Sequence, residues 1–249
     1  VRQQVDVSEL TLDSDIFKES DEHELVELRK QINNCLGHIE EALVNGSRIK
    51  DPGTFFHCLG TCYSRLGHYT LALKYYRQAV EEKPQNSGFH FKLINTALEL
   101  ALHNEAEIAL KDPMNWWPNN PNFLDLQGML RAKQGHWQAA TVIYQKAVQF
   151  SPNNARLHDG LARALLVQGN TDTAFNHSMK SIQIDNTNPG HFRTLSRVLA
   201  ASKRYEESMR ALREANEKTK IQKQSDQKNE IGLLQSLQLQ LDKATDFIL

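Results

Sequence analysis

The sequence repeats itself every 34 residues, and this periodicity restricts the possible folds more than any other feature of the chain. The residues around Gly60 and Tyr76 return 68 positions later around Gly128 and Tyr144, with a further copy between them. Five units of this length fill the segment 53–222 without an insertion. Such a period is typical of solenoids, in which each unit buries its apolar face only by stacking on its neighbours.

The recurring residues have a consistent chemistry. Gly60 and Gly128 add no bulk to the first helix of a unit at the place where Ala72 and Ala140 of the second helix must approach. This pattern resembles the tetratricopeptide repeat, whose unit is two antiparallel helices with small residues at their crossing. The resemblance implies an all-α fold: a right-handed superhelical solenoid of helix-turn-helix units with N-terminal and C-terminal capping helices, and with one concave and one convex face.

The predicted organisation follows the repeat phase. An acidic N-terminal segment covers 1–21, and an N-terminal capping helix with its linker covers 22–52, where apolar residues recur at helical spacing. The five repeat units are 53–86, 87–120, 121–154, 155–188 and 189–222. A C-terminal capping helix is expected within 223–249. The polar stretch 218–228 is either a connector or a long exposed helical segment.

Composition excludes several classes of protein. The chain has 29 basic and 30 acidic side chains and a formal net charge of −1, which disfavours a generally basic nucleic-acid binder. No run of about 18 apolar residues exists, so we expect no membrane insertion. No leader is visible in residues 1–20, because they are acidic and lack an apolar core, and a processed or truncated start stays open because residue 1 is Val. Three cysteines suit a reducing compartment, and the predicted location is therefore cytoplasmic.

No catalytic motif stands out, and we expect a protein that is not an enzyme and has no cofactor. Cys35 and His38 together with Cys58 and Cys62 offer a donor set that could satisfy tetrahedral zinc. The spacing is loose, however, and Cys62 occupies a repeat position for a small residue, where a free cysteine serves as a small hydrophobe. The interpretation without a metal is preferred.

The second unit departs from the pattern at Pro113, which stands where other units have a small residue of the second helix. A proline there is expected to stop that helix about a turn early. Trp116 and Trp117 follow, and they either fill the space left by a shortened helix or form an aromatic platform for a partner; the first interpretation is preferred. His90 and His158 occupy an aromatic position of the unit and are expected to pack with one polar edge satisfied.

The charged residues expected on the concave face are the strongest indication of function in the sequence. In tetratricopeptide proteins the groove is lined by the first helix of each unit, and here those positions hold seven basic residues against the acidic residues Glu99, Asp125 and Asp159. The basic candidates for peptide binding are Arg65, Lys92, Lys133, Arg156, Arg163, Arg193 and Arg197. Asn95 adds an amide at a position that in similar proteins holds a peptide backbone. Some of the charges could pair with each other, as Arg156 and Asp159 could at a spacing of three residues.

The predicted function is a non-catalytic protein-protein interaction scaffold that binds an acidic or carboxylate-bearing peptide segment in this basic groove. The positions that bind a chaperone tail in similar proteins are not matched, which disfavours that ligand. The alternative is a recruiting or regulatory domain of a larger enzyme whose catalytic part lies outside the chain. Self-association is a third possibility. The acidic segment 1–22 could itself dock in the groove, although a solvated tail is favoured.

Overall fold

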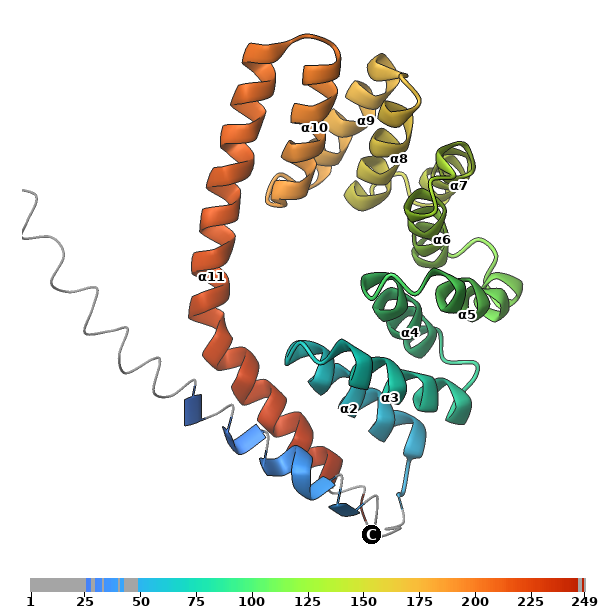
Figure 1. The fold of residues 1–249 in the computed structure, drawn as a ribbon, viewed down its shortest axis with the longest axis vertical. Helices are drawn as coiled ribbons and strands as arrows, with labels where there is room; N and C mark the ends of the chain where they lie inside the picture. The colour runs from blue at the N-terminus through green and yellow to red at the C-terminus, as the bar shows by residue number, and fades with distance from the viewer. Residues whose placement is uncertain are drawn as a thin grey trace, which may run out of the picture.

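The structure, a computed structural model, describes residues 26–27, 30–32, 34–39, 41–42, 49–245 and 248. Consecutive helices pack in pairs and form five helical hairpins (Figure 1). The pairs are α2 (Pro52–Arg65) with α3 (Tyr69–Glu82), α4 (Ser87–Glu99) with α5 (His103–Trp116), α6 (Pro121–Lys133) with α7 (Trp137–Phe150), α8 (Ala155–Val167) with α9 (Thr171–Ile184), and α10 (Pro189–Ala201) with α11 (Tyr205–Thr245). The only β pairing among the described residues is a single bridge between Ile49 and Ile248. The predicted all-α class is confirmed.

A side-chain cap begins the first helix of every hairpin. The capping residue is an asparagine or aspartate whose side chain accepts a hydrogen bond from a backbone N–H at the start of the helix, which satisfies a donor that the helix leaves unpaired. These caps are Asp51, Asn86, Asn120, Asn154 and Asn188. The last four follow one another at intervals of 34 residues, so the sequence period reappears as a regular series of helix starts.

The turn between the two helices of each hairpin contains one residue with a positive φ. It is a glycine in three units, and Gly67 is an example with φ +82°, which is a conformation that only glycine adopts without strain. The equivalent residues of the second and fifth units are Ala101, with φ +56°, and Lys203, with φ +61°. These two units therefore keep the turn geometry at the cost of local backbone strain.

Neighbouring units meet where a glycine faces a tyrosine. Tyr144 of α7 is buried and lies between Gly128 of its own unit and Gly160 of the next unit. A Cβ atom at Gly128 would come within 2.8 Å of the Tyr144 ring, and one at Gly160 would come within 2.5 Å. Both glycines therefore allow a close helix crossing that any larger residue would obstruct.

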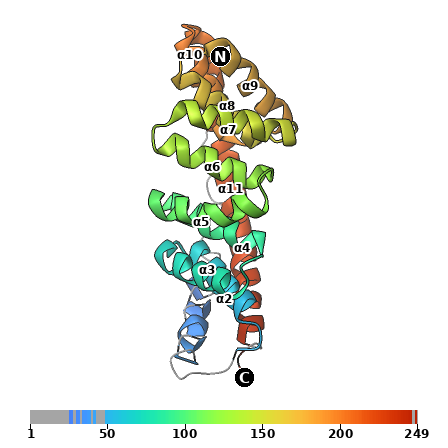
Figure 2. The same ribbon diagram turned by 90° about the vertical axis from the view of Figure 1, so that its right-hand side faces the viewer.

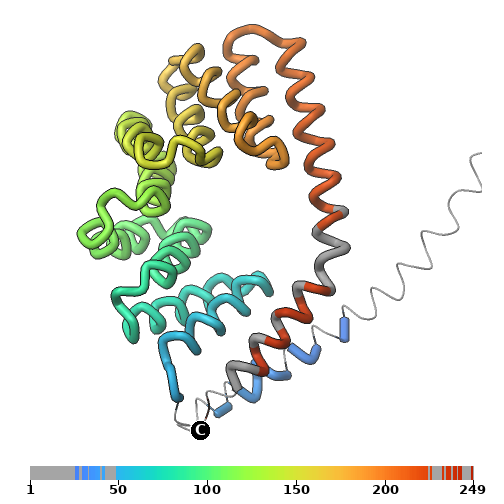
Figure 3. The backbone as a smooth tube through the Cα atoms, turned by 180° about the vertical axis from the view of Figure 1, so that it is seen from behind, coloured from blue at the N-terminus to red at the C-terminus, as the bar shows by residue number. Residues whose placement is uncertain are grey.

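The hairpins curve into an arc, and α11 runs from the end of the arc back to its beginning. Figures 1 and 3 show α11 leaving α10, passing along the open side of the arc and ending beside α2. Figure 2 shows the hairpins stacked along one axis with α11 behind them. At 41 residues, α11 is about 60 Å long. The helix therefore includes the second helix of the fifth unit, the polar stretch 218–228 and the predicted C-terminal helix, with no break at residue 222.

The C-terminal part of α11 covers the first unit. Leu234 and Leu241 are buried in the same apolar cluster as Ile32 and Ile39 from the N-terminal helical residues and Leu59 of α2. The sequence led us to expect a helix that closes the end of the array from which it emerges. The continuous helix instead carries these leucines to the opposite end, where they share one core with the N-terminal helical residues.

Pro113 does not stop α5, and the expected early end of that helix is wrong. The helix continues to Trp116, with Pro113 buried inside it. A proline has no N–H, so α5 loses the one hydrogen bond that residue 113 would donate to the preceding turn, but the helix does not end there. The carbonyl of Pro113 still accepts a hydrogen bond from the N–H of Trp117 at 2.7 Å, which closes the helix.

Candidate functional site

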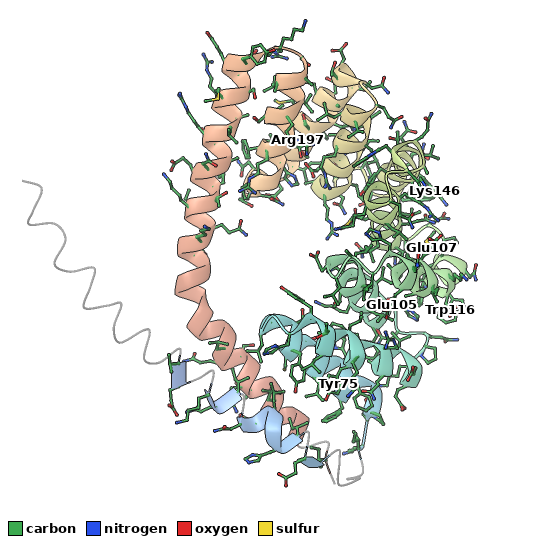
Figure 4. All side chains as sticks on the ribbon, in the orientation of Figure 1. Tyr75, Glu105, Glu107, Trp116, Lys146 and Arg197 are labelled. Carbon is green, nitrogen blue, oxygen red and sulfur yellow. The ribbon has the colours of Figure 1, made fainter. Side chains whose placement is uncertain are left out.

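The predicted basic residues lie on the first helix of each hairpin. Figure 1 shows α4 and α6 nearer to the inside of the arc than α5 and α7. All seven side chains are exposed, from Arg65 on α2 to Arg197 on α10, and Asn95 is half-buried on α4. Trp116 and Lys146 lie on the opposite, outer side of the arc (Figure 4). The inner side therefore carries a row of solvent-accessible cations.

Two of these cations hold buried carboxylates. The Arg156 Nε atom lies 2.5 Å from Oδ2 of Asp125 in the preceding unit, and the Arg163 Nε atom lies 3.0 Å from Oδ2 of Asp159 on its own helix. Arg156 thus pairs across the unit boundary rather than with Asp159. Burial raises the pKa of the Asp125 carboxyl, and the two arginines oppose this shift. These ion pairs stabilise the charge of carboxylates that water reaches poorly.

The structure brings three of the predicted residues together in one pocket. Lys133 of α6, Arg163 of α8 and Arg197 of α10 line a pocket of about 240 Å³ on three successive units. Its remaining lining is mainly apolar or aromatic and consists of Met129, Ala132, Trp137, Tyr144, Gly160 and Val167. Cationic groups above an apolar lining suit a ligand that has a carboxylate beside an apolar group.

The apolar half of this pocket was not predicted from the sequence. Trp137 and Tyr144 come from α7, the second helix of the unit, which the groove positions of the repeat do not include. The close approach at Gly160 brings the Tyr144 ring beside α8. An aromatic residue followed by a second one seven positions later was the available signal, because that spacing puts both on one face of a helix.

The other predicted residues lie outside the pocket. Arg65, Lys92 and Asn95 belong to the first two units, and Arg156 is paired with Asp125. Arg193 donates a hydrogen bond from Nη2 to Oγ1 of Thr219 at 2.7 Å, which links α10 to α11. The predicted basic stretch is thus divided between a pocket, ion pairs within the fold and a contact with α11.

His191, which was not predicted from the sequence, lies near two carboxylates at the start of the fifth unit. Its buried ring lies with Nδ1 3.6 Å from Asp159 Oδ1 and Nε2 3.7 Å from Asp185 Oδ2. Neither His191 Nδ1 nor Asp159 Oδ1 has a hydrogen-bond partner among the described residues. The ring therefore lies between carboxylates of α8 and of the segment before α10 without a hydrogen bond to Asp159 Oδ1.

The repeat histidines pack as predicted. His90 Nε2 lies 2.6 Å from the carbonyl oxygen of Pro84, and His158 Nε2 lies 2.9 Å from that of Pro152. Each buried ring therefore satisfies one polar edge on the loop before its own helix. His158 Nδ1 is also 2.9 Å from Nδ1 of His177, and burial together with His158 lowers the pKa of His177.

The two tryptophans lie in different surroundings. Trp117 packs against the core and stacks on Phe123 of the next unit, with ring centroids 5.6 Å apart. Trp116 remains 42% exposed and meets the edge of the His90 ring. Trp117 therefore packs between two units, but α5 is not shortened, so the space that the tryptophans were expected to fill does not arise; Trp116 lies on the outer surface.

The cysteines near the N-terminus are free thiols. Burial raises the pKa of Cys35, of Cys58 and of Cys62, to about 12 for Cys62. In the part of the chain that the structure describes, no group of three or more His, Cys, Asp or Glu residues could hold a metal ion. No helix of this part is both long and apolar enough to cross a membrane.

Comparisons with known proteins agree with this architecture. Residues 54–86 match the model of the tetratricopeptide repeat family. No curated protein matches the sequence significantly. A thermophilic TPR protein from Thermus thermophilus is 20% identical, with a TM-score of 0.61 over 73% of this chain and 98% of that one.

Two further solved structures have the same fold. PilF of Pseudomonas aeruginosa is 17% identical, with a TM-score of 0.58 over 73% of this chain and 89% of that one. MamA of Desulfovibrio magneticus is 14% identical, with a TM-score of 0.57 over 70% of this chain and 98% of that one. At these identities the likeness concerns the fold alone. The resemblance predicted from the sequence is confirmed for the unit 54–86, which matches the tetratricopeptide model, and the array of hairpins has the fold of solved tetratricopeptide proteins.

Proposed function

We propose that the concave face binds an acidic or carboxylate-bearing segment of a partner protein, and that the pocket between α6, α8 and α10 anchors it. The observation that carries this proposal is the convergence of Lys133, Arg163 and Arg197 on one pocket. Neither Lys133 nor Arg197 has an ion-pair partner among the described residues. Their charges are therefore available to a ligand, whereas Arg163 is shared with Asp159.

The chemistry of the pocket favours a particular kind of segment. An apolar side chain would bury against Trp137 and Met129, and a neighbouring carboxylate would accept hydrogen bonds from Lys133 and Arg197. The cations farther along the row, such as Lys92, would steer an acidic chain toward the groove rather than add much affinity. No group in this arrangement points to a reaction, so the proposed role is that of a non-catalytic scaffold.

A labelled peptide of the sequence 1–22 is a suitable probe, because it is acidic and has apolar residues between its carboxylates. Fluorescence anisotropy of this peptide with the full chain should show binding that weakens with salt. Lys133→Glu and Arg197→Glu should each raise the dissociation constant by about tenfold. Lys146→Glu makes the same charge change on the outer side and should leave the constant unchanged.

The same measurement has a clear opposite outcome. Equal affinity of the parent and of both groove variants would overturn the proposal, as would equal binding of a peptide whose acidic residues are replaced by their amides. The segment 1–22 lies outside the described residues, and its docking in the chain's own groove stays a prediction. Deleting residues 1–20 from the chain should tighten binding of the free peptide if the tethered copy competes with it.

The remaining predictions about context stay open to test. A recruiting or regulatory role within a larger enzyme, a cytoplasmic location and the use of Arg65, Lys92, Asn95, Arg156 or Arg193 by the same ligand are predictions of the sequence alone. The proposed peptide site does not depend on any of them.

A further inference from the structure

Contacts between neighbouring hairpins show which side of a hairpin's second helix is covered by the next hairpin. In the third unit, the Gln168 side chain after α8 donates to the Trp137 carbonyl at 3.3 Å and to Thr141 Oγ1 at 2.6 Å. Gly160 of α8 packs on the Tyr144 ring. The next unit thus covers three positions of α7, namely those of Trp137, Thr141 and Tyr144.

The equivalent positions in the fifth unit are apolar and uncovered. They lie 68 residues later and hold Tyr205, Met209 and Leu212, which are 64%, 52% and 39% exposed. In each of the first four units, the position equivalent to Leu212 is buried; in the third unit it is Tyr144, which is 1% exposed. No described element lies beyond the N-terminal part of α11 on the side away from α10 (Figures 1 and 3). The C-terminal part of α11 does not fold back over this face, because it packs on the first unit.

We propose that this uncovered face is a dimer interface on which the same face of a second copy packs, with the two α11 helices antiparallel. The charges beside the apolar stripe favour a copy of the chain over an unrelated helix. Glu206 and Arg213 are exposed, lie two helical turns apart on one side of the stripe, and have no ion-pair partner among the described residues. Their midpoint falls between Met209 and Arg210.

A two-fold axis near Met209 would therefore bury the apolar side chains and pair the charged ones in the same contact. Antiparallel helices related by such an axis bring the same flank of each helix together, so Glu206 of each copy meets Arg213 of the other. Met209 and Leu212 of both copies then form the centre, and Tyr205 lies at each end. The arrangement is self-complementary, as a two-fold interface between identical chains requires.

Sedimentation velocity of the full chain tests this interface without any ligand. The parent should sediment with twice the 28.4 kDa mass of the chain at concentrations of tens of micromolar or below, as expected for a modest interface. Met209→Glu should make the protein monomeric, because it buries two facing carboxylates at the centre of the contact. Val142→Glu, at a side chain on α7 that is 62% exposed, is the matched control and should leave the dimer intact.

A charge exchange distinguishes this arrangement from any other dimer. Glu206→Arg and Arg213→Glu should each weaken dimerisation by about tenfold, because each places like charges in both symmetric pairs. The double variant should recover the parental dissociation constant. A monomeric parent at these concentrations, a dimer that survives Met209→Glu, or a double variant no better than the single ones would each overturn the proposal, and none of these results would bear on the peptide site.

Discussion

Replacing Gly160 with alanine should destabilise the protein, although alanine favours helices. The added Cβ would lie 2.5 Å from Cε1 and 2.6 Å from Cζ of Tyr144, well inside van der Waals contact. The ring cannot retreat, because a Cβ built at Gly128, on its other side, would already approach the ring to 2.8 Å. Overpacking of this kind costs about 1–3 kcal/mol. The higher helix propensity of alanine relative to glycine offsets about 0.5–1 kcal/mol of this loss in the free energy of unfolding.

The net expectation is a loss of about 1–2 kcal/mol in the free energy of unfolding, measured by urea denaturation followed by circular dichroism. Gly232→Ala in α11 is the matched control: nothing lies within 4 Å of its added Cβ, so this variant should gain about 0.5–1 kcal/mol. In a Tyr144→Leu background the Gly160→Ala change should no longer destabilise. A Gly160→Ala variant as stable as Gly232→Ala would refute the close packing of adjacent units at this tyrosine.

Three other predictions concern a paired and an unpaired arginine, the backbone strain at Lys203 and the pKa of His177. Arg156→Ala should lower the free energy of unfolding by about 1–2 kcal/mol, because it leaves the buried Asp125 carboxylate without its partner, whereas Arg197→Ala should be nearly silent in the same urea assay. Lys203→Gly should raise the thermal midpoint and add about 0.5–1 kcal/mol, because it relieves a positive φ; an unchanged midpoint would argue against strain there. The pKa of His177 is lowered in the folded state, so the unfolded chain binds the proton first and stability should fall as pH drops below about 6.5; His177→Gln should flatten this dependence in pH-dependent melts.

Much of the fold was predictable because its determinants are local and periodic. The 34-residue repeat of the small residues fixes the helix crossings, and an asparagine or aspartate before each first helix fixes its start. The buried roles of His90 and His158 followed from their repeat position alone. Pro113 misled the prediction because a proline removes one hydrogen bond and strains the preceding turn without necessarily ending the helix, and here the buried ring lies within α5.

The path of α11 was not predictable from the same reasoning. The apolar residues Leu234 and Leu241 indicate a helix that packs on something, but their spacing does not say which end of the array receives them. The pocket was only half predicted for a similar reason. Lys133, Arg163 and Arg197 occupy known groove positions, whereas the contribution of Trp137 and Tyr144 depends on how closely two units approach each other.

The course of α11 also has a mechanical consequence. The pitch and curvature of a tetratricopeptide superhelix can vary through small rotations between units. Here a single helix, α11, has a fixed rise per residue and joins the two ends of the array. The hydrogen bond of Arg193 with Thr219 holds it at one end, and the burial of Leu241 holds it at the other. Stretching or tightening the arc requires α11 to bend or to leave the first unit. The groove is therefore held near one curvature before any ligand arrives, which reduces the conformational entropy that binding would otherwise remove.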